Sequence, residues 1–269
     1  MGQPKPVGRP ERPDADADVD ADVDADAEVD VERAARLVDA ARCVLLDLDG
    51  PVTRLFPGDS WLELSRQVRD AAVDAAVAAG PGPLTGTLAR ALADQTDHVQ
   101  CLRIVAHHAP HLLPLVADLV TRAELEVART ATAYPAAVRL IERTVDRGAQ
   151  VAVVTNNDPR VVAVVLERAR PGLTALLAGV HGRSVGTVDD LKPRPDLLLR
   201  GLVDAGCAPG DAVFLGDSVT DVQAGEAAGV VVVGVSEDAA RRDELRAAGA
   251  VAVLPDLTAL APTTGDGPG

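Results

Sequence analysis

The stretch CVLLDLDG, residues 43–50, decides the fold of this 269-residue chain. Its apolar run, closed by acidic residues and Gly50, predicts a short buried strand that leads into a loop. Asp47 and Asp49 are two residues apart, so in extended chain their carboxylates point to the same face. Their repulsion requires a nearby cation or a raised pKa. An ordinary Asp-Gly turn is the alternative interpretation of this stretch taken alone.

Downstream of Tyr134-Pro135 the chain alternates between helices and apolar strands. The expected strands are 150–155, 178–183, 212–216, 230–235 and 250–254, and the expected helices are 136–147, 159–169, 195–205, 221–228 and 237–248. Near-continuous Val and Leu runs that alternate with helices indicate a parallel sheet covered on both faces. The predicted class is therefore α/β, with a Rossmann-like core, and functional residues are expected at the carboxyl ends of the strands.

Residues 57–132 form a different kind of segment. Helical spacing recurs over 59–80, 84–94, 98–109 and 112–131, with breaks at Pro83, Pro110 and Pro135. Since this segment has no strand pattern, we expect an all-α cap over 57–132, inserted into a core made of 31–56 and 133–256. Its histidines, read as partly exposed structural residues, are His98, His107, His108 and His111.

Both ends of the chain are predicted to be tails. Residues 1–30 end in a repeat of Asp with Ala or Val, which predicts a disordered acidic tail, and 257–269 are expected to be flexible. Residues 1–32 carry eleven acidic against three basic side chains, so about half of the net charge of −15 lies there.

The composition also excludes several classes of partner. An acidic surface disfavours nucleic acids and anionic membranes. Only four aromatic residues are present, too few for a surface that stacks nucleobases: Phe56, Trp61, Tyr134 and Phe214. The three cysteines have no CxxC spacing and indicate reduced thiols. Since no apolar run suggests a leader or a membrane span, we expect a cytoplasmic location. The sequence gives no indication of the oligomeric state.

Three further strand ends carry polar residues. Thr155 and Asn156 close one predicted strand, where a hydroxyl and free backbone amides suit a phosphate oxygen, although a plain helix cap would look the same. Lys192 is one of only two lysines in a chain with 24 arginines, which indicates a need for a compact ammonium group. Asp217 and Asp221 follow the strand AVFLG, and such hard oxygen ligands suit Mg²⁺, although Asp221 could simply cap a helix.

Together these motifs have a family likeness. In order, LLDLDG, VVTNN, KPRPD and FLGDSVTD resemble the haloacid dehalogenase-like (HAD) phosphohydrolase superfamily, over roughly residues 40–255. The segment DVQAGEAAGVVVVGV is similar to the phosphoglycolate phosphatase-like branch, and the helical insertion is similar to a C1-type cap. The resemblance implies an Mg²⁺-dependent phosphomonoester hydrolase that acts on a small phosphorylated metabolite through an aspartyl phosphate.

The resemblance also implies a role for each motif residue. Asp47 would be the nucleophile and Asp49 the general acid and base. Thr155 and Lys192 would hold the phosphoryl group, with Gly50, Asn156 and Arg54 as further candidates for phosphate or substrate contact. Mg²⁺ would bind Asp47, the backbone carbonyl of Asp49 and Asp217, with Asp221 direct or through water. Pro51 departs from the family pattern by removing one backbone donor from the loop.

Other functions on the same fold stay open to different degrees. A phosphoglucomutase-like phosphoryl transferase would share the two acidic pairs, and a binding or regulatory protein could use the fold without catalysis. Dehalogenation would not need Asp49. Phosphonate cleavage in this superfamily uses a cap lysine, and residues 51–191 contain none.

Overall fold

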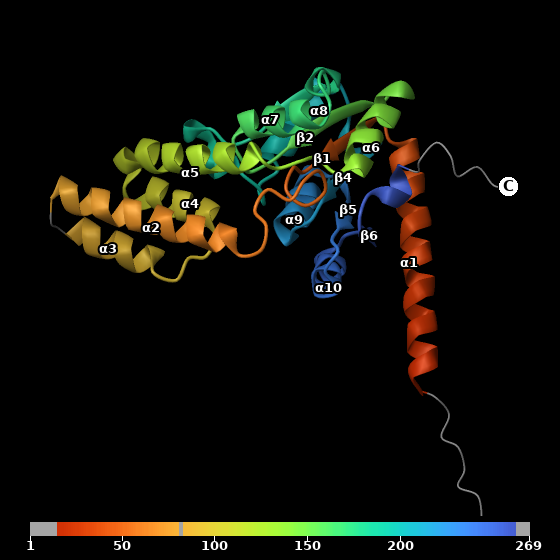
Figure 1. Ribbon diagram of the computed structural model, residues 1–269, viewed down its shortest axis with the longest axis horizontal. Helices are drawn as coiled ribbons and strands as arrows, with labels where there is room; N and C mark the ends of the chain where they lie inside the picture. Colours follow the sequence, from red (N-terminus) through yellow and green to blue (C-terminus); the bar gives the residue numbers. More distant parts are fainter. Residues whose placement is uncertain (1–14, 81–82, 262–269) are drawn as a thin grey trace, which may run out of the picture.

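The computed structural model describes residues 15–80 and 83–261, which form a parallel sheet with helices on both faces and a separate layer of helices at one end (Figure 1). The strands are β1 (Cys43–Leu46), β2 (Gln150–Val154), β3 (Gly179–His181), β4 (Ala212–Gly216), β5 (Val231–Val235) and β6 (Ala252–Leu254). They pair in the order β3-β2-β1-β4-β5-β6, and every pair is parallel. The predicted α/β class is confirmed.

The helices lie close to their predicted ranges. Those of the core are α1 (Ala15–Ala40), α6 (Pro135–Asp146), α7 (Pro159–Ala169), α8 (Asp196–Asp204), α9 (Val219–Ala228) and α10 (Ala239–Ala248). Those of the insertion are α2 (Ser60–Ala79), α3 (Pro83–Leu92), α4 (His98–His108) and α5 (Leu113–Ala128). The described part of the insertion contains helices only, as an inserted cap requires.

The sheet is apolar on both faces because alternate residues of each strand point to opposite sides. Val44 and Leu46 of β1 belong to the cluster beneath α1, α6 and α7, whereas Cys43 and Leu45 belong to the cluster on the other face. Phe214 of β4, fully buried, is the largest side chain of that second cluster. This two-sided burial explains why the strands are continuous runs of Val and Leu.

The cap has an apolar core of its own, built from α2 to α5. One member comes from elsewhere: Val188 lies in the short 3₁₀ segment Val185–Asp190 that precedes Lys192. Conversely, Val99 of α4 belongs to a core cluster. The division into core and cap at the predicted boundaries stays a prediction.

The predicted tails are wrong in part. Helix α1 already begins at Ala15, inside the stretch expected to be disordered, and Figure 1 shows its first turns extending away from the sheet. Alanine is the best helix former, and acidic residues near an amino terminus complement the helix dipole. Asp30 of this helix also pairs with Arg246 of α10 at 3.0 Å. Residues 1–14 lie outside the described part.

The carboxyl-terminal prediction also needs correction. Leu257, Leu260 and Ala261 are buried in the core cluster beneath the sheet, so the ordered fold continues to residue 261. Arg139 Nε donates to Ala261 O at 3.0 Å, and Arg143 donates to Leu260 O. Residues 262–269 lie outside the described part.

None of the described helices is long and apolar enough to cross a membrane.

Candidate active site

The site lies where three neighbouring strands end. Leu46 of β1 is paired with Val153 of β2 and with Leu215 of β4, so the carboxyl ends of these strands are level. Asp47, the residue after β1, donates its backbone N–H to Leu215 O at 2.9 Å and is buried. The central position of β1 therefore places Asp47 between the residues that follow β2 and β4.

Lys192 reaches this point from the loop before α8. Its Nζ lies 2.8 Å from Asp47 Oδ1, 2.7 Å from Asp221 Oδ1 and 3.2 Å from Val154 O. Its ammonium group therefore lies among two carboxylates and one carbonyl oxygen. Although burial lowers the pKa of Lys192, the charges of Asp221 and Asp47 outweigh it and raise that pKa above its usual range. The lysine thus stays charged although its side chain is buried.

Asp221 is completely buried, and its second oxygen, Oδ2, accepts hydrogen bonds from the residues before α9. Its Oδ2 accepts from Asp217 N and Ser218 N, both at 3.1 Å, and from the Ser218 hydroxyl at 2.8 Å. Ser218 in turn caps α9, so this is a reciprocal capping arrangement. Both oxygens of Asp221 are engaged by protein groups. A metal ion would therefore meet this residue through water more easily than directly.

Carboxylates of Asp47, Asp217 and Asp221 come within 4.8 Å of one another and form a possible metal site. Burial raises the pKa of Asp217 well above its usual value, and the charges of Asp221, Asp47 and Asp49 add to this effect. Burial likewise raises the pKa of Asp47 to about 7, although Lys192 lies beside it. A divalent cation would relieve this repulsion, and the donors are the hard oxygens that such ions prefer. The residues present therefore fit a metal ion.

Asp49 lies two residues after Asp47, in the loop that follows β1. Its Oδ1 accepts from Leu55 N at 2.7 Å, which fixes the orientation of the carboxyl group. Burial raises the pKa of Asp49 to about 6, despite the opposing effects of the Leu55 N–H and the Arg54 charge. A carboxyl group with such a pKa can both release and take up a proton near neutral pH.

Thr155 follows β2 and is buried, and its hydroxyl oxygen accepts from Asn157 N at 3.2 Å. Because the oxygen is the acceptor there, the hydroxyl proton stays available for a phosphate oxygen. The Asn156 side chain points elsewhere: its Nδ2 donates to Lys192 O at 3.2 Å, and its Oδ1 accepts from Lys192 N at 2.9 Å. Among the described residues, the backbone N–H groups of Asp49 and Asn156 have no acceptor. Any contact of Asn156 with phosphate would therefore come from its backbone.

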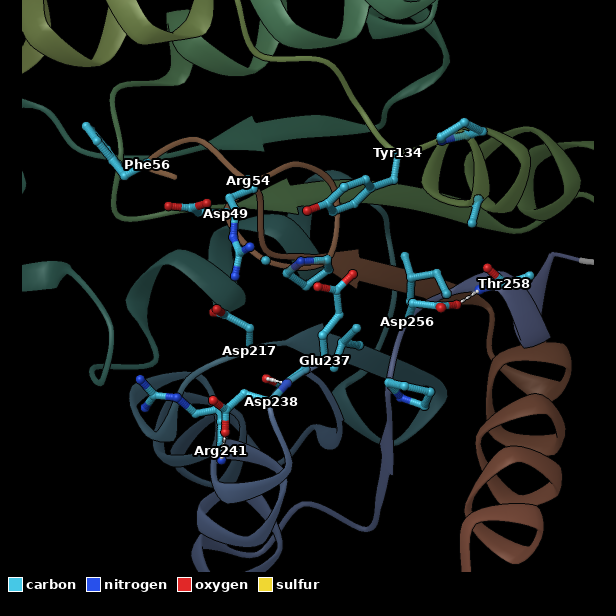
Figure 2. A pocket seen from close by; sticks show the side chains of 18 of the residues that line it. Asp49, Arg54, Phe56, Tyr134, Asp217, Glu237, Asp238, Arg241, Asp256 and Thr258 are labelled. Atoms are coloured by element: carbon cyan, nitrogen blue, oxygen red, sulfur yellow. Dashed lines mark hydrogen bonds between the residues drawn. The ribbon is translucent and has the colours of Figure 1, made fainter. Parts of the chain in front are cut away.

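A pocket of about 810 Å³ opens beside these residues, and Gly50, Arg54 and Phe56 line it together with Asp49 and Asp217. Figure 2 shows Asp49, Arg54 and Asp217 at one end of this pocket and Asp256 and Thr258 at the other. The exposed Arg54 lies near Asp49 in this view.

The pocket wall includes residues that the sequence did not single out as site residues, namely Tyr134, Glu237, Asp238 and Arg241.

A second group of residues that the sequence did not indicate joins the cap to the core. Glu124 of α5 and Arg183 after β3 form a buried ion pair at 2.6 Å, and Glu124 also accepts from Asp158 N at 3.0 Å. His98, expected to be partly exposed, is buried 3.9 Å from Glu124. Isolated charged residues in helices and loops give no sequence signal for such pairing.

Residues 41–229 match the family described as haloacid dehalogenase-like hydrolase. This chain belongs to that family, and the matched residues contain the parallel sheet from β1 to β4, the acidic groups and Lys192.

Two individual proteins resemble this chain more specifically than the family as a whole does. A phosphoglycolate phosphatase of Rhodospirillum rubrum is 31% identical over 238 residues, which cover 81% of this chain and 89% of that protein. A phosphoglycolate phosphatase of Pseudomonas putida is 31% identical over 179 residues, or 66% of this chain and 61% of that protein. The chain is thus a HAD-like hydrolase homologous to phosphoglycolate phosphatases, which confirms the predicted enzyme class.

Solved structures show the same fold. CbbY of Rhodobacter sphaeroides, crystallised with phosphate, aligns with a TM-score of 0.56 at 22% identity over 81% of this chain and 95% of that one. The helical insertion between β1 and β2 is consistent with the predicted C1-type cap.

Proposed function

We propose that this protein is an Mg²⁺-dependent phosphatase that hydrolyses small phosphomonoesters through an aspartyl phosphate on Asp47. The observation that carries the proposal is the contact of Asp47 with Lys192 at 2.8 Å, at the buried end of the central strand. The Leu48 N–H, also 2.8 Å from Asp47 Oδ1, holds the same oxygen. The nucleophile is thereby oriented before any substrate binds, which lowers the entropic part of the barrier.

Proton transfer falls to Asp49. In the first step Asp47 forms a bond to phosphorus, the bond from phosphorus to the leaving oxygen breaks, and Asp49 donates a proton to that oxygen. In the second step the Asp49 carboxylate removes a proton from water as the water attacks phosphorus. Inorganic phosphate leaves and Asp47 regains its carboxylate. The raised pKa of about 6 suits Asp49 for both directions of transfer.

The phosphoryl oxygens would be held by three kinds of donor. These are the Thr155 hydroxyl, the Lys192 ammonium group, and the free backbone N–H groups of Asp49 and Asn156. Mg²⁺ would be held by Asp47, Asp217 and the backbone carbonyl of Asp49, and Asp221 would contact it through water. Bound Mg²⁺ supplies positive charge where the transferring phosphoryl group develops negative charge.

The test is hydrolysis of p-nitrophenyl phosphate with and without Mg²⁺, in the wild type and in Asp47→Asn. We expect Mg²⁺-dependent release of phosphate and a loss of at least about 1000-fold in kcat for Asp47→Asn. A matched control is Asp243→Asn, because Asp243 is an exposed carboxylate on α10 that pairs with Arg246. Full activity of Asp47→Asn would refute the proposed nucleophile, and an inactive wild type would refute the phosphatase.

The same assay separates hydrolysis from phosphoryl transfer. A mutase would return the phosphoryl group to a second sugar hydroxyl and release little phosphate. Phosphoglycolate is the first metabolite to test, since the relatives at 31% identity carry that name. The site would accept it through the groups described above, and a phosphomonoester with a higher kcat/KM would replace it as the preferred substrate.

A further inference from the structure

One cap side chain contacts the backbone of the loop that carries Lys192. Arg103 of α4 uses its Nη2 to donate to Leu191 O at 2.7 Å and to Lys192 O at 3.0 Å. Both acceptors are backbone oxygens. The guanidinium group therefore fixes the path of the chain at Lys192, whatever side chains the loop carries.

The Lys192 peptide is held from the opposite side by the core. Asn156, which follows β2, bonds both the carbonyl and the N–H of Lys192 with its side-chain amide. Lys192 O thus receives one donor from the cap, Arg103, and one from the core, Asn156. A carbonyl oxygen has two lone pairs, so the two donors do not compete.

Apolar packing reinforces this junction. Val188, four residues before Lys192, is buried within the apolar cluster of the cap, while Val99 of α4 is buried in a cluster of the core. Helix α4 and the segment before Lys192 are therefore packed into each other. A shift of α4 against the sheet would pull on this segment at Arg103 and at Val188 together.

The other end of Lys192 is sensitive to such a shift. Its buried Nζ has contacts of 2.7 to 3.2 Å with Asp221, Asp47 and Val154 O. A displacement of the Lys192 backbone by a few tenths of an ångström must lengthen at least one of them.

We propose that Arg103 is a positioning residue that couples the placement of the cap to the placement of the Lys192 ammonium group. This inference rests on the proposed function, since Lys192 affects turnover only if Asp47 takes up a phosphoryl group. The coupling itself is a property of the loop and can be measured without any substrate.

The experiment compares Arg103→Met and Arg103→Lys with Arg122→Met. Arg122 is a matched control because it is an exposed cap arginine that pairs only locally, with Asp118 one turn earlier. Backbone hydrogen exchange is followed by mass spectrometry in a peptide that covers 186–192. Thermal unfolding, kcat and KM for p-nitrophenyl phosphate with Mg²⁺ are measured on the same samples.

For Arg103→Met we expect exchange in that peptide to be faster by about tenfold, because local opening is easier. We also expect kcat to fall by about tenfold with KM within about threefold of the wild type, because a misplaced Lys192 weakens the transition state more than the ground state. Arg103→Lys should recover part of both effects, and Arg122→Met should show neither.

Two results would overturn the inference. One is exchange at 186–192 that is the same in Arg103→Met and Arg122→Met. The other is a loss of kcat that is accounted for by the unfolded fraction, with no change in the exchange of this peptide relative to the rest of the core. An inactive wild type would refute the proposed function alone, since the exchange measurement would still decide whether Arg103 holds the loop.

Discussion

Gly50 shows how closely the two acidic motifs approach each other. Its φ is +99°, a conformation that residues with a side chain rarely adopt. A Cβ at this position would lie 2.4 Å from the Cγ of Asp217. The glycine therefore serves both the loop conformation and the contact between the ends of β1 and β4.

We expect Gly50→Ala to displace Asp217 and to lower kcat by about 100-fold, because a misplacement of about 1 Å is that costly. The backbone strain should also reduce the free energy of unfolding by about 1–2 kcal/mol. The measurements are steady-state kinetics with Mg²⁺ and urea unfolding.

Gly58→Ala is the matched control for this substitution. Gly58 also has a positive φ, +60°, but a Cβ there would meet no atom within 4 Å. It should share the loss of stability and keep its kcat. If both variants lost activity equally, the proximity of Gly50 to Asp217 would not be the cause.

At the scale of elements, helices α4 and α5 of the cap are joined to the end of β3 by a buried polar cluster. Arg183 and Glu124 form its ion pair, and the backbone N–H of Arg183 also donates to Asn157 O at 2.8 Å. His98 at the start of α4 faces Glu124. The pKa of His98 is lowered to about 4, mainly by burial; the Asp97 charge opposes this shift and the Arg183 charge adds to it.

This lowered pKa predicts how stability depends on pH. In the unfolded chain His98 takes up a proton near its ordinary pKa of about 6.5, whereas in the folded chain it does so only near pH 4. The unfolded state thus binds more protons between these values, and stability present above pH 6.5 is lost as the pH falls toward 4. Between pH 7 and pH 5, His98 should account for a loss on the order of 1–2 kcal/mol.

The measurement is the free energy of unfolding at pH 7 and pH 5 for the wild type, His98→Gln and His111→Gln. The first variant should lose less stability on acidification than the wild type. The second replaces an exposed histidine of the same cap and should behave as the wild type does. Equal losses in all three proteins would contradict the assignment to His98.

At the scale of the whole molecule, the last described residues pack against the first helix of the chain. Residues 257–261 lie against α1 and α6, with Leu257, Leu260 and Ala261 buried beneath the sheet. An ion pair at the surface also joins these two helices, since Arg143 of α6 pairs with Asp39 of α1.

A chain that ends after Asp256 should therefore be less stable than a chain that ends after Ala261. Removing two buried leucines should cost on the order of 4 kcal/mol or more. Urea unfolding of the two truncated proteins beside the full chain measures this difference. The chain that ends after Ala261 should match the full chain, and equal stability of all three would show that residues 257–261 are dispensable.

Much of the fold and of the candidate site could be predicted from local sequence patterns. Runs such as CVLL and AVFLG predicted the strands because continuous apolar residues fit only a sheet covered on both faces. The acidic pairs and the solitary Lys192 then marked the carboxyl ends of β1 and β4 and the loop before α8. In the tertiary structure Lys192 Nζ lies within 2.8 Å of Asp47 and Asp221. Chain order and residue type were sufficient there, since parallel strands end at one edge.

Other features were decided only by the tertiary structure. The contacts of Arg103 with Lys192 O and of Glu124 with Arg183 join residues 89 and 59 positions apart, and no local pattern specifies such partners. The same holds for the burial of His98 and of residues 257–261, which depends on which surfaces meet after folding. Periodicity along the chain reports which face of an element is apolar, but the partner of a buried polar group is set by packing between elements.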